Sequence, residues 1–324
     1  MNRVKCLLCP RGCELKEGQR GDCKARMNIS GKLKSLVYGS PCAVHVDPIE
    51  KKPLFHYLPG SKSFSIATAG CNLHCMYCQN WEISQRNPED TRNIKLSPED
   101  VVKEAVNADC KTIAYTYSEP IIFFEYSIDT AKLAHKKDIR NIWVTAGYIN
   151  EEPLNEAVQY IDASNVDIKG ITDKFYRTMS NATLDPVLNT VKTMREKGVW
   201  VEITNLVVPT YNDTKEDFSK LSEWILKNVG EDVPLHFSRF WPMHKLKNLP
   251  PTPEEVLTNA RNIAMSEGLN YVYVGNVPGH PGNDTYCPKC KKTVIKRRGY
   301  MILEYNIEGV SCKFCGNGIE GVWS

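Results

Sequence analysis

Seven short β-rich runs alternate with helical patterns through the middle of the chain, and this alternation restricts the fold more than any other feature. The runs span residues 63–68, 112–117, 141–145, 163–169, 200–208, 234–240 and 271–275. Between them, apolar residues recur at helical spacing in residues 97–108, 120–138, 151–160, 185–198, 214–228 and 252–268. Repetition of strand and helix predicts βαβ units and a parallel sheet.

The number of strands narrows the architecture to two α/β folds. Seven strands are one fewer than a closed eight-stranded barrel contains. We therefore expect a partial, open βα barrel of about six or seven parallel strands or a doubly wound sheet. In both folds ligands bind at the carboxyl ends of the strands, so the residues that follow each strand are the first candidates for a functional site.

Eleven of the thirteen cysteines fall into three groups, and the groups divide the chain. They are Cys6, Cys9, Cys13 and Cys23, then Cys71, Cys75 and Cys78, and finally Cys287, Cys290, Cys312 and Cys315. We expect a Cys-rich N-terminal module over residues 1–62, the βα core over residues 63–282, and a small C-terminal module over residues 283–324.

The cellular compartment decides how these cysteines are interpreted. The first residues carry charge and cysteine where a secretory signal needs an apolar segment, and no apolar run approaches the ~20 residues of a membrane span. We therefore expect a cytoplasmic protein without membrane contact, in which thiols stay reduced and clustered cysteines indicate metal. The formal net charge of +3 gives little reason to expect a nucleic-acid partner.

The central cysteine group follows the first predicted strand directly, in the stretch GCNLHCMYCQN from Gly70 to Asn80. Its spacing is C-x3-C-x2-C, with no fourth cysteine nearby. Three thiolates can hold three irons of a 4Fe–4S cluster and leave the fourth iron open. An open iron can bind an amino acid through its amine and carboxylate, as S-adenosylmethionine offers.

This motif, with the aromatic Tyr77 before its last cysteine, resembles the radical SAM superfamily. The resemblance implies that Cys71, Cys75 and Cys78 hold the cluster and that Tyr77 lies at the cofactor. The segment TYSEP (116–120) closes the second strand and places Glu119 at its end. It stands where the superfamily has a Gly-Gly-Glu-like element, which implies that Glu119 binds the methionyl amine of the cofactor.

Two later strand ends carry further candidates. Asp167 and Lys169 alternate in DIKG (167–170) and so point to the same side, as an ion pair or as cofactor and substrate contacts. The Asp-x-Lys element resembles one that lies at the cofactor in pyruvate formate-lyase-activating enzymes. The segment PMHKL (242–246) resembles a Pro-x-His element of the same enzymes, which implies a cofactor or substrate contact for His244; a solvated loop histidine is the alternative.

A narrower resemblance covers nearly the whole chain. Residues 37–84, 233–242, 252–257 and 271–279, together with the final Cys-x-x-Cys-Gly and Gly-Val-Trp, resemble the radical SAM enzyme of the AmmeMemoRadiSam system, a group similar to pyruvate formate-lyase-activating enzymes. The resemblance implies an oxidoreductase in which the cluster reductively cleaves S-adenosylmethionine to a 5′-deoxyadenosyl radical, and this radical abstracts hydrogen from a substrate. It also implies a one-electron donor such as flavodoxin or ferredoxin, and no side chain is needed as acid or base.

The substrate class stays open at this stage. One class is a protein backbone, as in glycyl radical activation. The other is a small molecule or a nucleic acid, with the extra metal modules as binding elements. The C-terminal module is rich in lysine and arginine, which suits a solvated face or an acidic partner.

Each of the two outer cysteine groups predicts a metal site. Two Cys-x-x-Cys knuckles flank β runs in the C-terminal module, which is typical of a zinc ribbon, and structural zinc is preferred there to an iron–sulfur cluster. The N-terminal spacing C-x2-C-x3-C-x9-C leaves zinc and an auxiliary cluster as equal alternatives.

Overall fold

The structure is a computed structural model and describes residues 3–324. An eight-stranded sheet, in the order β12-β11-β10-β9-β8-β7-β6-β5, forms its centre. All neighbours from β6 to β12 run parallel, and β5 (Ala43–Pro48) pairs antiparallel with β6. The parallel strands are β6 (Lys62–Ala67), β7 (Thr112–Tyr115), β8 (Arg140–Thr145), β9 (Ala163–Asp167), β10 (Trp200–Val207), β11 (Leu235–Arg239) and β12 (Val272–Gly275).

All seven predicted parallel strands are present, and the partial, open barrel is confirmed. Strands β5 and β12 are the two edges, and no ladder joins them within residues 3–324, so the sheet does not close. Strand β5 was not predicted as part of the core. It lies within the expected N-terminal module but contributes one edge strand to the central sheet.

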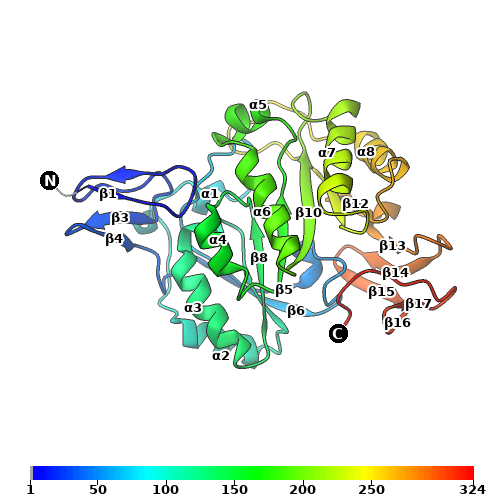
Figure 1. The fold of residues 1–324 in the computed structure, drawn as a ribbon, viewed down its shortest axis with the longest axis horizontal. Coiled ribbons are helices and arrows are strands. Elements are labelled where there is room, and N and C mark those ends of the chain that lie inside the picture. Colours follow the sequence, from blue (N-terminus) through cyan, green and yellow to red (C-terminus); the bar gives the residue numbers. More distant parts are fainter. Residues whose placement is uncertain (1–2) are drawn as a thin grey trace.

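Helices connect the parallel strands, as the periodicity predicts (Figure 1). The capping box is formed at α2, where the Ser97 side chain accepts from the Asp100 amide and Asp100 accepts from the Ser97 amide. Gly198 and Gly268 end two other helices with φ of +83° and +121°. The helices are α1 (Trp81–Ser84), α2 (Pro98–Asn107), α3 (Phe124–His135), α4 (Glu151–Ala157), α5 (Asp173–Phe175), α6 (Asp185–Glu196), α7 (Lys215–Asn228) and α8 (Glu254–Ser266).

The N-terminal residues form two small hairpins that extend from one end of the molecule (Figure 1). Strand β1 (Val4–Lys5) pairs with β2 (Glu14–Leu15), and β3 (Arg26–Ile29) pairs with β4 (Lys32–Ser35). The short strands hold the first three cysteines in one tight loop, because the Cys6 amide donates to the Cys13 carbonyl at 2.9 Å.

The C-terminal module lies at the opposite end (Figure 1). It contains a three-stranded sheet and a short hairpin: β13 (Thr285–Tyr286), β14 (Thr293–Arg298), β15 (Met301–Tyr305), β16 (Ile307–Glu308) and β17 (Ser311–Cys312). Val322 then pairs with the segment before β6, donating to His56 O and accepting from Leu58 N, both at 2.7 Å.

One side chain of the C-terminal module enters the core. Arg297 is fully buried, and its guanidinium donates to Phe55 O at 2.9 Å and to Thr285 Oγ1 at 2.8 Å. It also stacks over the Phe55 ring and lies 3.9 Å from the buried Glu50 carboxylate. The basic residues of this module therefore differ in role: Arg297 is buried and anchors the module, whereas the lysines are exposed.

Within residues 3–324 no helix combines the length and apolar character that crossing a bilayer requires.

Candidate functional site

The three central cysteines lie in the loop that follows β6, at the carboxyl end of the parallel sheet. This loop is tied to residues 176–180, a single π-helical turn, because His74 N donates to Ser180 O at 3.0 Å and Met76 N donates to Met179 O at 2.9 Å. Lys245, in the loop that follows β11, donates its amide to Met76 O at 2.9 Å. Three separate connections therefore hold the cysteines in one place.

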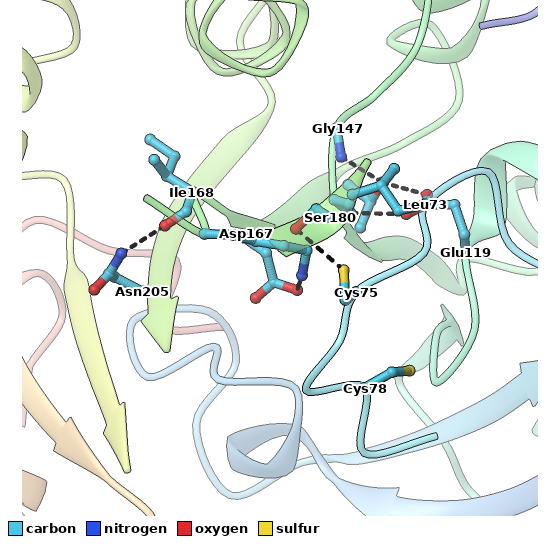
Figure 2. Close-up of polar contacts among 12 residues, drawn as sticks. Leu73, Cys75, Cys78, Glu119, Gly147, Asp167, Ile168, Ser180 and Asn205 are labelled. Atoms are coloured by element: carbon cyan, nitrogen blue, oxygen red, sulfur yellow. Dashed lines mark hydrogen bonds and ion pairs between the residues drawn. The ribbon is translucent and has the colours of Figure 1, made fainter. Parts of the chain in front are cut away.

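Each of the three thiols has a polar partner. The Leu73 amide donates to Cys71 Sγ at 3.3 Å. Ser180 Oγ lies 3.4 Å from Cys75 Sγ (Figure 2). Ser84 Oγ lies 3.1 Å from Cys78 Sγ. Amides and hydroxyls that can donate to sulfur stabilise the thiolate form, which is the form that binds metal.

Glu119 closes the neighbouring strand and is 2% exposed. Its carboxylate accepts from Thr145 Oγ1 at 2.5 Å, from Ala146 N at 2.8 Å and from Ile121 N at 3.3 Å. Burial raises the pKa of Glu119 to about 7, and these hydrogen bonds oppose the rise. Two carboxylate oxygens offer about four acceptor positions, so three donors leave room for one more.

The Asp167–Lys169 pair lies at the end of β9. Lys169 Nζ is 2.8 Å from Asp167 Oδ2, as expected for alternate residues on one side of a strand. Burial alone would lower the pKa of Lys169, but the charges of Asp167 and Cys75 raise it well above its ordinary value. The ammonium is thus a fixed positive charge next to the cysteine loop.

Tyr77 and His244 occupy different environments. Tyr77 is 4% exposed, and its hydroxyl lies 3.2 Å from Ser180 Oγ. His244 is partly exposed and has a φ of +53°, and its ring stacks on Trp81 at a centroid distance of 5.4 Å. Burial, together with Lys245 and Lys247, lowers the pKa of His244. Both residues therefore border the cysteine loop, Tyr77 from within the core and His244 from the surface.

Several polar residues that support this site were missed in the sequence. Ser180 contacts both Cys75 and Tyr77 from a turn that has no simple sequence pattern. Asn205 donates to the Ile168 carbonyl at 2.8 Å (Figure 2). Asn212 donates to the Lys169 carbonyl at 2.8 Å, so the two asparagines fix the chain on either side of Lys169. For Asn205 the sequence does carry a signal, because a polar asparagine inside a predicted buried strand indicates a specific hydrogen-bonding role.

The C-terminal cysteines meet at one point. Cys287 Sγ lies 3.7 Å from Cys315 Sγ, and Cys290 Sγ lies 3.8 Å from Cys312 Sγ. All four sulfurs lie within 4.8 Å of one another, and within residues 3–324 no other set of three or more Cys, His, Asp or Glu ligands is this compact. These four residues could hold a metal ion.

The region that contains the central cysteines matches a known protein family. Residues 65–225 match the model of the radical SAM superfamily. The chain belongs to the radical SAM superfamily. An uncharacterized protein of Methanocaldococcus jannaschii is 46% identical over 321 residues, which cover 98% of this chain and 96% of that protein.

More distant relatives of this radical SAM protein have named activities. The pyruvate formate-lyase-activating enzyme of Clostridium pasteurianum is 28% identical over 170 residues, covering 49% of this chain and 67% of that enzyme. Among solved structures, a radical SAM methyltransferase from Sphaerobacter thermophilus matches with a TM-score of 0.54 at 12% identity, over 71% of this chain and 70% of the other. The structural likeness supports the shared fold alone.

Radical SAM membership implies an enzyme with a 4Fe–4S cluster and S-adenosylmethionine, and the central site fits such a cluster. Its donors are three thiols, spread more widely than a single ion needs. Burial, with a smaller contribution from Glu119, raises the pKa of Cys71 well above its ordinary value, and burial likewise raises the pKa of Cys75. Only a strongly cationic ligand would keep such buried thiols ionised.

Proposed function

We propose that this protein is a radical SAM oxidoreductase similar to the activating enzymes, with Cys71, Cys75 and Cys78 holding the cluster that binds S-adenosylmethionine. One observation carries the proposal: the three-thiol loop, the buried Glu119 and the Asp167–Lys169 pair follow β6, β7 and β9 at the same, carboxyl edge of the parallel sheet. When bound, the cluster and cofactor together supply a 5′-deoxyadenosyl radical that takes a hydrogen atom from the substrate.

Glu119 is assigned to the ammonium of the cofactor. Its carboxylate has an acceptor position that the protein leaves unused, and Thr145 and Ala146 hold it in one orientation. A charge-assisted hydrogen bond in a buried site is short and directional, so it would fix the methionyl part of the cofactor. Because burial raises the pKa of Glu119 to about 7, the bound ammonium would also favour its ionised form.

Lys169 and Asp167 are assigned to the polar part of the cofactor or substrate. Asp167 remains about one-third exposed while it pairs with Lys169, so its carboxylate can accept from a ligand without losing its partner. Tyr77 is assigned to the wall beneath the cofactor and His244, stacked on Trp81, to its outer edge. These side chains bind, orient and exclude water, and none of them has to transfer a proton.

A protein backbone is the preferred substrate class. The support is the set of relatives named activating enzymes, including pyruvate formate-lyase 1-activating enzyme of Escherichia coli, which is 24% identical over 223 residues and 63% of this chain. A one-electron donor of the flavodoxin or ferredoxin class would then serve as redox partner.

Modification of a nucleic acid or small molecule is the second candidate. Lys289, Lys291, Lys292 and Lys296 are exposed on the C-terminal module, alongside the exposed rings of Tyr300, Tyr305 and Phe314. Interleaved cations and aromatic rings suit phosphates and bases. Retention of RNA that weakens steeply with salt would favour this candidate, and no retention at low salt would remove it.

Structural zinc is proposed for Cys287, Cys290, Cys312 and Cys315. Four Zn–S bonds of about 2.3 Å in a tetrahedron place the sulfurs about 3.8 Å apart. The two sulfur–sulfur distances of 3.7 and 3.8 Å match this value.

The experiment is an anaerobic assay for 5′-deoxyadenosine. The protein is reconstituted with iron and sulfide, reduced, and incubated with S-adenosylmethionine, and the product is quantified by mass spectrometry. A variant with Cys71→Ala, Cys75→Ala and Cys78→Ala is measured beside it. Product from the parent alone supports the proposal, and equal background from both, with a fully loaded cluster and bound cofactor in the parent, contradicts it.

A further inference from the structure

The N-terminal cysteines line a small cavity of about 20 Å³. Cys6, Cys9 and Cys13 reach it from the loop between β1 and β2, and Cys23 reaches it from the turn before β3. The turn is closed by a hydrogen bond of 2.9 Å from Lys24 N to Gly21 O. Four cysteines from two chain segments thus line one small cavity.

The surroundings of this cavity suit neither water nor simple packing. A buried water needs two to four polar partners. The surface that lines this cavity is apolar, and Leu8, Leu15, Ile121 and Ile122 contribute to it. Arg26 also lines the cavity and is 5% exposed. Its Nη2 pairs with Glu125 at 2.5 Å, but its buried Nε has no hydrogen-bond partner within residues 3–324. An unpaired cationic N–H beside four sulfurs indicates an anionic metal–thiolate group.

The spacing of the sulfurs distinguishes this group from the C-terminal quartet. A single tetrahedral zinc needs its sulfurs about 3.8 Å apart, as the C-terminal quartet has them. Within residues 3–324 the N-terminal group contains no three sulfurs that all lie within 4.8 Å of one another, and the cavity lies among them. Each thiolate of a four-iron cluster binds a different iron, which sets the sulfurs farther apart than a single ion does.

The cavity also adjoins the central cysteine loop. Asn72 lines it and follows Cys71 directly in the chain. A Cβ atom on Gly70 would lie 2.3 Å from the Cys23 carbonyl oxygen, and Gly70 has a φ of +99°, so only glycine allows this approach. Arg11 Nε, from the N-terminal loop, donates to Asn72 O at 2.7 Å. The two cysteine loops are therefore in direct contact.

We propose that Cys6, Cys9, Cys13 and Cys23 hold a second 4Fe–4S cluster in which all four irons are bound by protein thiolates. Such a cluster has no open iron and therefore cannot bind S-adenosylmethionine. The Arg26 guanidinium donates toward it, and Asn72 and Gly70 join its loop to the central site.

The test counts metals in the full-length protein after anaerobic reconstitution. The parent should contain about eight irons and one zinc. The Cys71→Ala/Cys75→Ala/Cys78→Ala variant should keep about four irons, and its reduced electron paramagnetic resonance spectrum should not change when S-adenosylmethionine is added. A Cys9→Ala/Cys23→Ala variant should also keep about four irons, with a spectrum that does change. Cys42→Ala, which alters a cysteine outside the three groups, should keep all eight.

Two results would overturn the second cluster: a triple variant with no iron, or a parent with about four irons and two zinc ions per chain. The test separates this proposal from the proposed function. If the central site does not bind S-adenosylmethionine, the parent spectrum will not respond to it, but the triple variant will still retain its iron.

Discussion

Replacing Arg297 should detach the C-terminal module from the base of the barrel. Its guanidinium has no exposed surface, donates to Phe55 O and Thr285 Oγ1, and stands 3.9 Å from the buried Glu50. Arg297→Met keeps the length and apolar stem of the side chain but leaves Glu50 without its positive neighbour. The substitution therefore isolates the loss of charge and hydrogen bonds from the loss of volume.

The expected loss in the free energy of unfolding follows from the Glu50 carboxylate, which stays buried in the variant. Removing one partner of a buried ion pair destabilises a protein by about 3–5 kcal/mol, because the other charge stays buried without compensation. With a urea dependence of about 3 kcal/mol/M, the unfolding midpoint should fall by roughly 1 to 1.7 M. The adjacent Arg298 is exposed, so Arg298→Met should change the free energy of unfolding by no more than about 0.5 kcal/mol.

The assay is urea unfolding of protein purified with zinc in the buffer, followed by circular dichroism at several pH values. Burial raises the pKa of Glu50, so the folded state holds that proton more tightly than the unfolded state does. The deficit of Arg297→Met should therefore shrink as the pH falls, and the double variant Glu50→Gln/Arg297→Met should recover much of the loss. A loss below about 1 kcal/mol for Arg297→Met, or a deficit that grows at low pH, would refute this reasoning.

Three further predictions concern ligands. Glu119→Gln should weaken S-adenosylmethionine binding by about 10- to 100-fold in equilibrium dialysis, because a hydrogen bond to a charged group contributes about 1.5–3 kcal/mol; the exposed Glu82→Gln should have no effect. Because burial raises the pKa of Glu119 to about 7, the ionised fraction that accepts the ammonium falls about tenfold between pH 8 and pH 6, and the affinity should fall with it in the parent but not in Glu119→Gln. Cys290→Ala/Cys312→Ala should lower zinc from about one ion per chain to none by mass spectrometry while iron is unchanged; loss of iron instead would place the cluster there.

The parallel strands of the sheet could be predicted because their signals are local. Buried parallel strands are short apolar runs, and helices between them carry a period of 3.6 and recognisable caps such as Ser97. Strand β5 (Ala43–Pro48) was missed because an antiparallel edge strand depends on its pairing with β6, which lies far enough along the chain to leave no local pattern.

Part of the candidate site could also be proposed from local sequence signals. Residues with their own motif, such as Cys71, Glu119 and Asp167, could be proposed from position at a strand end. Ser180 could not, because a π-helical turn brings it to Cys75 across 105 residues of sequence. The distances between the sulfurs of the two cysteine quartets could not be predicted either, since both quartets have four thiols and the folded chain sets their spacing.

The pairing of Val322 with the segment around His56 has a consequence for how the chain folds during its synthesis. More than 260 residues separate these partners, and each backbone bond between them is 2.7 Å long. At about 5–20 residues per second, the ribosome needs roughly 10 to 50 s to supply Val322 after His56 has been made. For that interval the backbone groups of His56 and Leu58 lack these two partners, although Leu54 and Tyr57 can already pack against the sheet. The nascent barrel therefore depends on its own parallel strands and on the apolar residues between positions 49 and 58 until the C-terminal module has been made.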